Sequence, residues 1–288
     1  MKALIVTADD FGLHEAVNEA IEQAHRGGVL TCASLMVGAA AIDDAVRRAR
    51  ALAQLAVGLH VVLADGQAVL PPRRIPALVD DSGRFADRMA RDGVRFFALP
   101  RVRRQLEAEI RAQFAAFAAT GLPLDHVNAH KHFHLHPTVL SMLLAIGAEH
   151  GRPPVRWPRE PRGASGRGAS LSGALLSPWL ALMRARLRAA GVACNDQIFG
   201  LSGTGAMDEA RVLEILAHLP EGVTEIYLHP ATRNGLTPTM STYRHRDELE
   251  ALLSARVRAA VSASGAATGG FRALTGARGP ISEPRRAA

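Results

Sequence analysis

Acidic residues and histidines follow four short apolar runs that lie far apart along the chain. Asp9 and Asp10 end ALIVTADDFG, His60 lies in VGLHVVL, a run of histidines begins in LDHVNAH, and His229 ends EIYLHPATRN. Each motif alone is typical of ordinary structure. A histidine in an apolar strand is usually a hydrogen-bonded core residue, and paired aspartates after a strand usually form a helix N-cap and a turn. Because the carboxyl ends of parallel strands open into one mouth, the four motifs together predict a shared site.

The chemistry that this set indicates is that of a catalytic metal ion. An aspartate oxygen with two neutral imidazoles leaves coordination positions open for water and substrate, as in catalytic zinc sites. Such an ion lowers the pKa of its water and polarises a carbonyl. Adjacent strand residues point to opposite faces, so Asp9 and Asp10 can share the site only if the strand has ended there. One carboxylate would bind the ion and its neighbour would act as general base. His229 would protonate a leaving nitrogen or stabilise an oxyanion.

Histidines are concentrated in the third motif. Five lie within eleven residues: His126, His130, His132, His134 and His136. Burying so many imidazoles without partners would be costly. Some of them are therefore expected to bind metal or substrate.

Bulk properties are those of an ordinary globular chain. The formal charge of +7 is concentrated, because residues 151–190 hold eight arginines and one acid, Glu160. Aromatic residues are not interleaved with this basic cluster, so no nucleic-acid partner is expected. Cys32 and Cys194 match no disulfide or metal pattern and are predicted to be buried thiols. No secretory leader or apolar run of membrane-spanning length is visible, which predicts a cytoplasmic protein.

Short apolar runs alternate with segments of helical periodicity. Strands are predicted at 3–8, 31–37, 57–63, 124–129, 154–157, 224–228 and 271–274. Helices are predicted at 14–26, 41–54, 101–120, 137–150, 172–190, 207–219 and 244–264. This alternation predicts an α/β fold with a parallel sheet covered by helices, either closed as a barrel or open and doubly wound.

The chain is expected to form one domain over residues 1–276. Two stretches interrupt the alternation, 65–100, rich in Pro, Gly and charge, and 159–173, rich in Gly, Ser and Arg. Excursions of this length are typical of lids or binding loops. Residues 277–288 are predicted to be a flexible tail.

The motifs TADDFGLHEAVNEAI, GLH, LDHVNAHKHFHLHP and LHPA, in this order and spacing, resemble the YdjC-like carbohydrate deacetylase family. The resemblance runs through most of the chain. It implies a distorted (β/α) barrel, similar to a TIM barrel, with about seven parallel strands. It also implies one divalent ion, zinc or magnesium, and removal of the acetyl group from N-acetylglucosamine-type sugars. By position, Asp10, His60 and His130 would be the ligands, Asp9 the base, and His229 a second catalytic residue.

Further residues are assigned to the substrate through the same resemblance. His132 and His134 match later histidines of the family's run, although HKHFH stands here where three consecutive histidines are common. Phe11 of the first motif and Arg156 of VRWPREP are also expected to contact the substrate.

Three stretches, VRWPREP, SPWLALMRARLRAAGVACND and GVTEIYLHPATRN, are similar to family members of hopanoid biosynthesis. This implies an N-acetylglucosaminyl triterpenoid lipid as substrate, with a soluble chitooligosaccharide as the alternative. Residues 171–190 combine leucines, Trp179 and arginines, which is typical of a helix at a membrane surface or of a core helix with a solvated end. We therefore expect peripheral contact with the inner face of the membrane through 171–190, and leave homo-oligomerisation open.

Two other functions compete with this interpretation. A metal-dependent phosphoesterase would hold two or more ions and needs more carboxylate ligands at strand ends than the sequence offers. In a non-catalytic sugar-binding or nucleic-acid-binding protein, the histidines would be structural and the arginines would meet phosphate.

Overall fold

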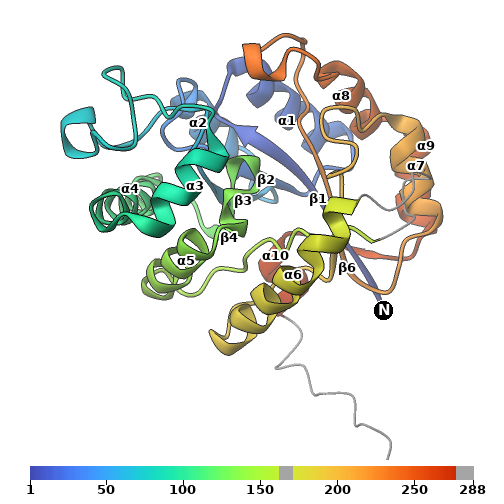
Figure 1. Ribbon diagram of the computed structural model, residues 1–288. Helices are drawn as coiled ribbons and strands as arrows, with labels where there is room; N and C mark the ends of the chain where they lie inside the picture. The colour runs from blue at the N-terminus through green and yellow to red at the C-terminus, as the bar shows by residue number, and fades with distance from the viewer. Residues whose placement is uncertain (162–170, 277–288) are drawn as a thin grey trace, which may run out of the picture.

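Parallel strands form the centre of the molecule, and helices lie around their outside (Figure 1). The computed structural model describes residues 1–161 and 171–276, and of residues 171–176 the backbone only. Six strands pair in the order β4-β3-β2-β1-β6-β5, β7 pairs with β1, and every one of these pairings is parallel. The strands are β1 Lys2–Phe11, β2 Cys32–Leu35, β3 Ala56–Val61, β4 Leu124–Ala129, β5 Gln197–Phe199, β6 Gly222–Leu228 and β7 Ala267–Thr268.

Three predicted helices, at 14–26, 101–120 and 137–150, are confirmed to within one residue at each end. The α-helices are α1 Glu15–Gly27, α2 Ile42–Arg50, α3 Met89–Ala98, α4 Pro100–Ala119, α5 Pro137–Glu149, α6 Leu171–Ala189, α7 Glu209–Ala217, α8 His245–Leu253, α9 Ala255–Ala263 and α10 Phe271–Gly276. Three short 3-10 helices are η1 Pro72–Arg74, η2 His130–Leu135 and η3 Pro238–Met240.

The strands form a single-domain, incomplete barrel, and an irregular segment lies across its gap. Residues 154–157, predicted as a strand, make one isolated bridge to Val127 of β4. The backbone N–H of Arg156 donates to the carbonyl of Val127 at 3.1 Å, and on the other side Ile198 of β5 donates to the carbonyl of Arg159 at 3.0 Å. The predicted distorted barrel is therefore confirmed, with this segment between the two edge strands.

The strand predicted at 271–274 is wrong, because these residues lie in α10. Both oxygens of Asp125 in β4 accept bonds from the first backbone N–H groups of that helix, at 2.9 Å from Phe271 and 3.0 Å from Arg272. This distant cap outweighs the local apolar pattern. The helix predicted at 244–264 is two helices, because the Ser254 hydroxyl caps the start of α9.

Helix α4 orders the excursion predicted at 65–100, which also contains α3. The buried carboxylate of Glu109 accepts the backbone N–H groups of Val69 and Leu70, each at 2.9 Å. Gln113 bonds both backbone groups of Val62, at 2.9 and 2.8 Å. The chain leaving β3 is thus attached to the domain. The 277–288 tail and most of the 159–173 loop lie outside the described residues.

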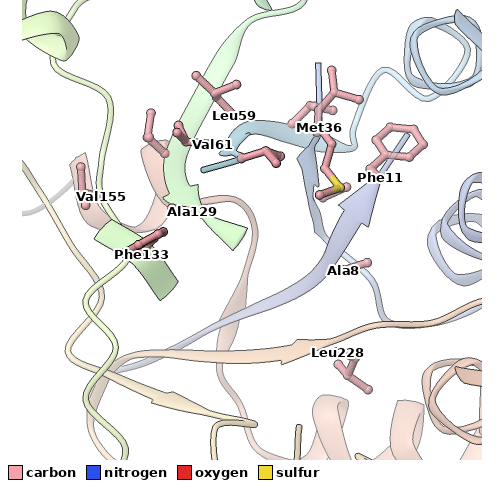
Figure 2. Packing of buried hydrophobic residues seen from close by; sticks show 14 of the residues in the cluster. Ala8, Phe11, Met36, Leu59, Val61, Ala129, Phe133, Val155 and Leu228 are labelled. Carbon is pink, nitrogen blue, oxygen red and sulfur yellow. The ribbon is translucent and has the colours of Figure 1, made fainter. Parts of the chain in front are cut away.

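One large apolar core fixes the strand ends. Figure 2 shows Leu59, Val61 and Ala129 of β3 and β4 in the same cluster as Phe133 of η2 and Val155 of the irregular segment. These side chains are at most 4% exposed. The carboxyl ends of β1, β3, β4 and β6 are therefore held on a rigid frame.

Candidate active site and metal centre

The two aspartates of DDFG occupy an irregular end of β1. The strand continues to Phe11, so the expectation that it has already ended is wrong. Instead, Asp10 has a φ of 65°, in the left-handed region, and the pairing with β2 shifts register between Ala8 and Phe11. Aspartate tolerates this conformation better than most residues. The irregularity interrupts the alternation of side chains, and Asp9 and Asp10 reach one buried group of polar residues.

Three side chains from separate elements meet there. Oδ1 of Asp10 lies 3.3 Å from Nε2 of His60 in β3 and 3.0 Å from Nδ1 of His130, the first residue of η2. One ligand atom from each residue lies within 4.8 Å of the others, and all three residues are buried. The convergence predicted for positions 10, 60 and 130 is therefore present.

The chemistry of these three residues fits a bound cation. Both oxygens of Asp10 and Nε2 of His130 are buried and have no hydrogen-bond partner among the described residues. Burial opposes ionisation of Asp10, but His130 outweighs it and lowers the pKa of Asp10 well below its usual value. Burial likewise opposes the charged form of His60, but Asp9 and Asp10 raise its pKa. The two imidazoles compensate the buried charge of Asp10 only in part, and a divalent ion would remove the remaining cost.

Asn128 in β4 holds His60 in the form that a metal ligand needs. Its Oδ1 lies 2.6 Å from Nδ1 of His60, and its Nδ2 donates to Asp9 at 3.2 Å and to Ser34 at 2.9 Å. Because the amide oxygen only accepts, Nδ1 of His60 carries the proton. Nε2, on the side of Asp10, is therefore the nitrogen that would bind a metal ion.

A buried arginine holds Asp9 beside these ligands. Arg156 donates to the two oxygens of Asp9 at 2.6 and 3.0 Å, and to the carboxylate of Glu225 in β6 at 2.6 to 3.0 Å. Burial opposes ionisation of Asp9, but the charge of Arg156 outweighs it and holds the pKa of Asp9 well below its usual range. Asp9 is thus an ionised carboxylate, held in place next to the candidate metal ligands.

His229 follows β6 and lies between the only two tyrosines of the sequence. Its ring centroid is 5.5 Å from that of Tyr227 and 5.2 Å from that of Tyr243. Its backbone N–H donates to Glu248 of α8, and its carbonyl accepts from Nδ1 of His245 at 2.6 Å. Burial lowers the pKa of His229. The ring is therefore a neutral N–H donor at neutral pH rather than a cation.

His132 and His134 lie on η2, where Lys131 and His132 both have positive φ, 53° and 54°. Nε2 of His132 lies 3.1 Å from the hydroxyl of Tyr227. Nδ1 of His132 and both nitrogens of His134 have no described partner. Burial and Arg156 lower the pKa of both rings, that of His134 to about 3. The neutral imidazole of His132 is partly exposed and is free to hydrogen-bond a ligand, whereas His134 is fully buried.

The other two histidines of the run are structural. His126 lies deep in the molecule, 3.0 Å from the hydroxyl of Ser34 and stacked on Phe271 at 4.5 Å. His136 accepts the backbone N–H of Thr138 and caps α5.

Two predicted substrate contacts are corrected by their burial. Phe11 is 0% exposed and packs in the main core, where Figure 2 shows it near Met36. Arg156 is also 0% exposed, and its donors are occupied by the two carboxylates. A sugar would not reach either side chain, so Phe11 supports the core and Arg156 positions Asp9.

Asn128, Glu225 and Tyr227 were missed from the sequence, although strand alternation offered a signal. Positions 126, 128 and 130 share one face of β4 and its extension, and positions 225, 227 and 229 share one face of β6. Each set ends on a histidine that was predicted to belong to the site.

A second group of ligand-type side chains, Cys32, Asp125 and His126, lies near the amino ends of β2 and β4. Its atoms already bond one another: the Cys32 thiol donates to Asp125 at 3.6 Å, and Nδ1 of His126 lies 3.1 Å from the same carboxylate. Burial and Asp125 raise the pKa of Cys32 well above its usual value. We therefore interpret this group as a structural cluster around a protonated thiol.

Comparisons with known proteins cover nearly the whole chain. The family model described as "YdjC-like protein" matches residues 3–263. A Salmonella paratyphi B protein named chitooligosaccharide deacetylase is 29% identical over 273 residues, which are 94% of this chain and 98% of that protein. A Brevibacillus brevis protein named carbohydrate deacetylase is 42% identical over 155 residues, 54% of this chain, and the match spans only 59% of that relative's length.

A solved structure has the same fold. The crystal structure of a candidate cellobiose-phosphate cleavage protein from Enterococcus faecalis V583 superposes with a TM-score of 0.74 and 26% sequence identity. The match covers 95% of this chain and 99% of that one.

Proposed function

Because this chain belongs to the YdjC-like family, we propose that it is a carbohydrate deacetylase that hydrolyses the acetamide of an N-acetylglucosamine-type sugar with one divalent ion. The observation that carries the proposal is the buried carboxylate of Asp10 between His60 and His130, with a second carboxylate, Asp9, beside it. The names of the Salmonella and Brevibacillus relatives support the same activity.

The residues of the site suit amide hydrolysis. A divalent ion held by Asp10, His60 and His130 would polarise the amide carbonyl and lower the pKa of the attacking water, so that even a weak base such as Asp9 can take its proton. Arg156 and Asn128 fix the orientation of Asp9, which would pass that proton to the departing amine. His229, neutral because of its lowered pKa, would donate its N–H to the developing oxyanion.

The substrate is proposed from the sequence resemblance to hopanoid-biosynthesis members. An N-acetylglucosaminyl lipid would place its sugar against the neutral imidazole of His132, which is partly exposed and whose Nδ1 has no described partner. A soluble chitooligosaccharide presents the same acetamide and would use the same groups. The ligand set of one carboxylate and two imidazoles favours zinc over magnesium, which prefers all-oxygen ligands.

Acetate release from diacetylchitobiose and from an N-acetylglucosaminyl lipid tests the proposal, with bound metal measured by mass spectrometry. We expect Asp9→Asn to keep the ion but lose turnover, because Asp9 is the proposed base and is not one of the three proposed metal ligands. His130→Ala should lose both, and a chelator should abolish wild-type activity. The control is His218→Ala, an exposed histidine outside the site. Full activity in Asp9→Asn or His130→Ala would contradict the roles assigned here.

The competing phosphoesterase would need a second ion. Within residues 1–161 and 171–276, the only other cluster of ligand-type residues is the hydrogen-bonded one at Cys32. One ion per chain supports the deacetylase, and two or more would support phosphoryl chemistry.

A further inference from the structure

Helix α3 exposes apolar side chains to solvent. Val94 is 68% exposed, Phe97 66%, and Leu99, just after the helix, 45%. The opposite face of α3 is firmly packed, since Phe96 is 1% exposed and its ring lies 5.2 Å from that of Phe133 in η2. The orientation of α3 is therefore fixed, and it leaves a row of apolar groups without a protein partner.

Exposed arginines flank these apolar groups in the sequence. Five exposed arginines lie on α3, at its start and in the first turn of α4: Arg88, Arg91, Arg101, Arg103 and Arg104. None of them pairs with a carboxylate in the described part of the chain. The acids of residues 87–104 are Asp87 and Asp92, and they are paired with Lys131 at 2.7 Å and with Arg95 at 2.9 Å. The surface thus has strong, uncompensated positive charge.

This surface lies beside the candidate active site. Asp87 binds Lys131, which directly follows the candidate metal ligand His130. The ring of Phe96 also contacts that of His136, at the start of α5. Figure 1 shows α3 next to α4 and α5 on the outside of the strands. A partner bound to α3 would therefore be close to η2 and the groups that η2 presents to the site.

We propose that α3 and the start of α4 form a docking surface for an anionic membrane. Aliphatic and aromatic groups among unpaired arginines match the interfacial region of such a bilayer, where apolar side chains enter and guanidinium groups meet lipid phosphates. A second copy of this chain fits less well, since a two-fold contact would place the two basic patches face to face. No helix among the described residues is long and apolar enough to cross a membrane, so the contact is interfacial.

The surface differs from the membrane contact predicted at 171–190. The biological role of the α3 surface rests on the proposed deacetylase function, because docking at α3 would bring the candidate active site to a sugar carried by a lipid. Binding to the bilayer itself needs no catalysis. The two proposals can therefore fail separately.

Cosedimentation of the full chain with phosphatidylglycerol-containing vesicles tests the surface. We expect binding to these vesicles and not to phosphatidylcholine vesicles. Val94→Ser/Phe97→Ser should weaken binding on the order of 100-fold, at about tenfold for each apolar group that leaves the interface. Arg88→Ala/Arg91→Ala/Arg101→Ala should weaken it on the order of 100-fold, at about fivefold for each arginine. Leu182→Ser, at a leucine of α6 that is 51% exposed, should bind like wild type.

Acetate release from soluble diacetylchitobiose is measured on the same samples and should be equal in all four proteins. Inactive wild type that still binds vesicles would refute the proposed function and leave the docking surface standing. Wild type that does not bind, or α3 variants that bind as tightly as wild type, would overturn the docking surface. So would a dimer in solution that the α3 substitutions dissociate, or loss of binding in Leu182→Ser alone.

Discussion

Replacing Arg156 by methionine would leave two buried carboxylates, Asp9 and Glu225, without their shared positive partner. The guanidinium makes five hydrogen bonds to them, all between 2.6 and 3.0 Å, in surroundings where all three side chains are at most 3% exposed. Removing one partner of a buried ion pair costs about 3 to 5 kcal/mol, because the remaining charge stays buried and unpaired. We expect Arg156→Met to lose about that much unfolding free energy at pH 7.

The loss should depend on pH with a defined sign. The pKa of Asp9 in the folded protein lies below its ordinary value of 3.8, so its pairing stabilises the fold above that pH and is lost as the pH falls further. In Arg156→Met, burial acts without the opposing charge and raises the pKa of Asp9 instead. Lowering the pH then neutralises the unpaired Asp9 of the variant and reduces its loss of unfolding free energy, while the wild type loses the stabilisation from its ion pair. The difference in unfolding free energy should therefore be largest near neutral pH and shrink as the pH falls toward 4, because the Asp9 carboxyl of the variant takes up a proton there. It should shrink further below pH 3.8, where the wild type loses its pairing.

Urea unfolding of wild type and Arg156→Met at pH 7 and pH 4 measures this difference. Adding Glu225→Gln to the variant should restore part of the stability, because one unpaired charge is removed. Arg111→Met, which removes an exposed pair with Glu149, should change the midpoint little. A difference that is equal at the two pH values, or no difference at pH 7, would refute this account of the network.

Two further predictions concern the supports of the site. Asn128→Ala should weaken metal binding by about 10- to 100-fold, because His60 loses the acceptor that fixes its tautomer; zinc titration calorimetry measures this, and unchanged affinity would contradict it. Burial raises the pKa of Glu248 to about 7. A raised carboxyl pKa gives stability that is present below the ordinary value and lost as the pH rises through about 7. Between pH 5 and pH 8, the unfolding free energy of wild type should therefore fall relative to that of Glu248→Gln, as measured by urea unfolding. The same dependence on pH in both proteins would contradict this prediction.

The sequence was sufficient to predict which strand ends meet. The apolar runs before Asp10, His60 and His229 are continuous, which is typical of parallel strands buried on both faces, and parallel strands have only one mouth for such residues. Local pattern was also sufficient for α1, α4 and α5, whose ends were placed to within one residue. Strands β5 and β7, with three and two residues, are too short to show a period.

What the sequence could not provide depends on partners far along the chain. Arg156 was expected to contact the substrate, yet it is buried because Asp9 lies 147 residues before it and Glu225 lies 69 residues after it. The bend at Asp10 is supported by Asn18, whose side chain accepts the backbone N–H of Gly12 at 2.8 Å. Residues 271–274 are helical because Asp125 caps them. None of these contacts is visible in a local window.

The left-handed backbone at Asp10 limits how its candidate metal site can be re-engineered. Exchanging this carboxylate for cysteine or glutamate would change the donor atom or its reach and would also place a less tolerant side chain at a φ of 65°. Asparagine and glycine accept that conformation but supply a weaker ligand or none. Attempts to alter ion preference should therefore start at His60 or His130. The φ of neither falls in the positive range, so a new donor can be introduced there without opposing the path of the main chain.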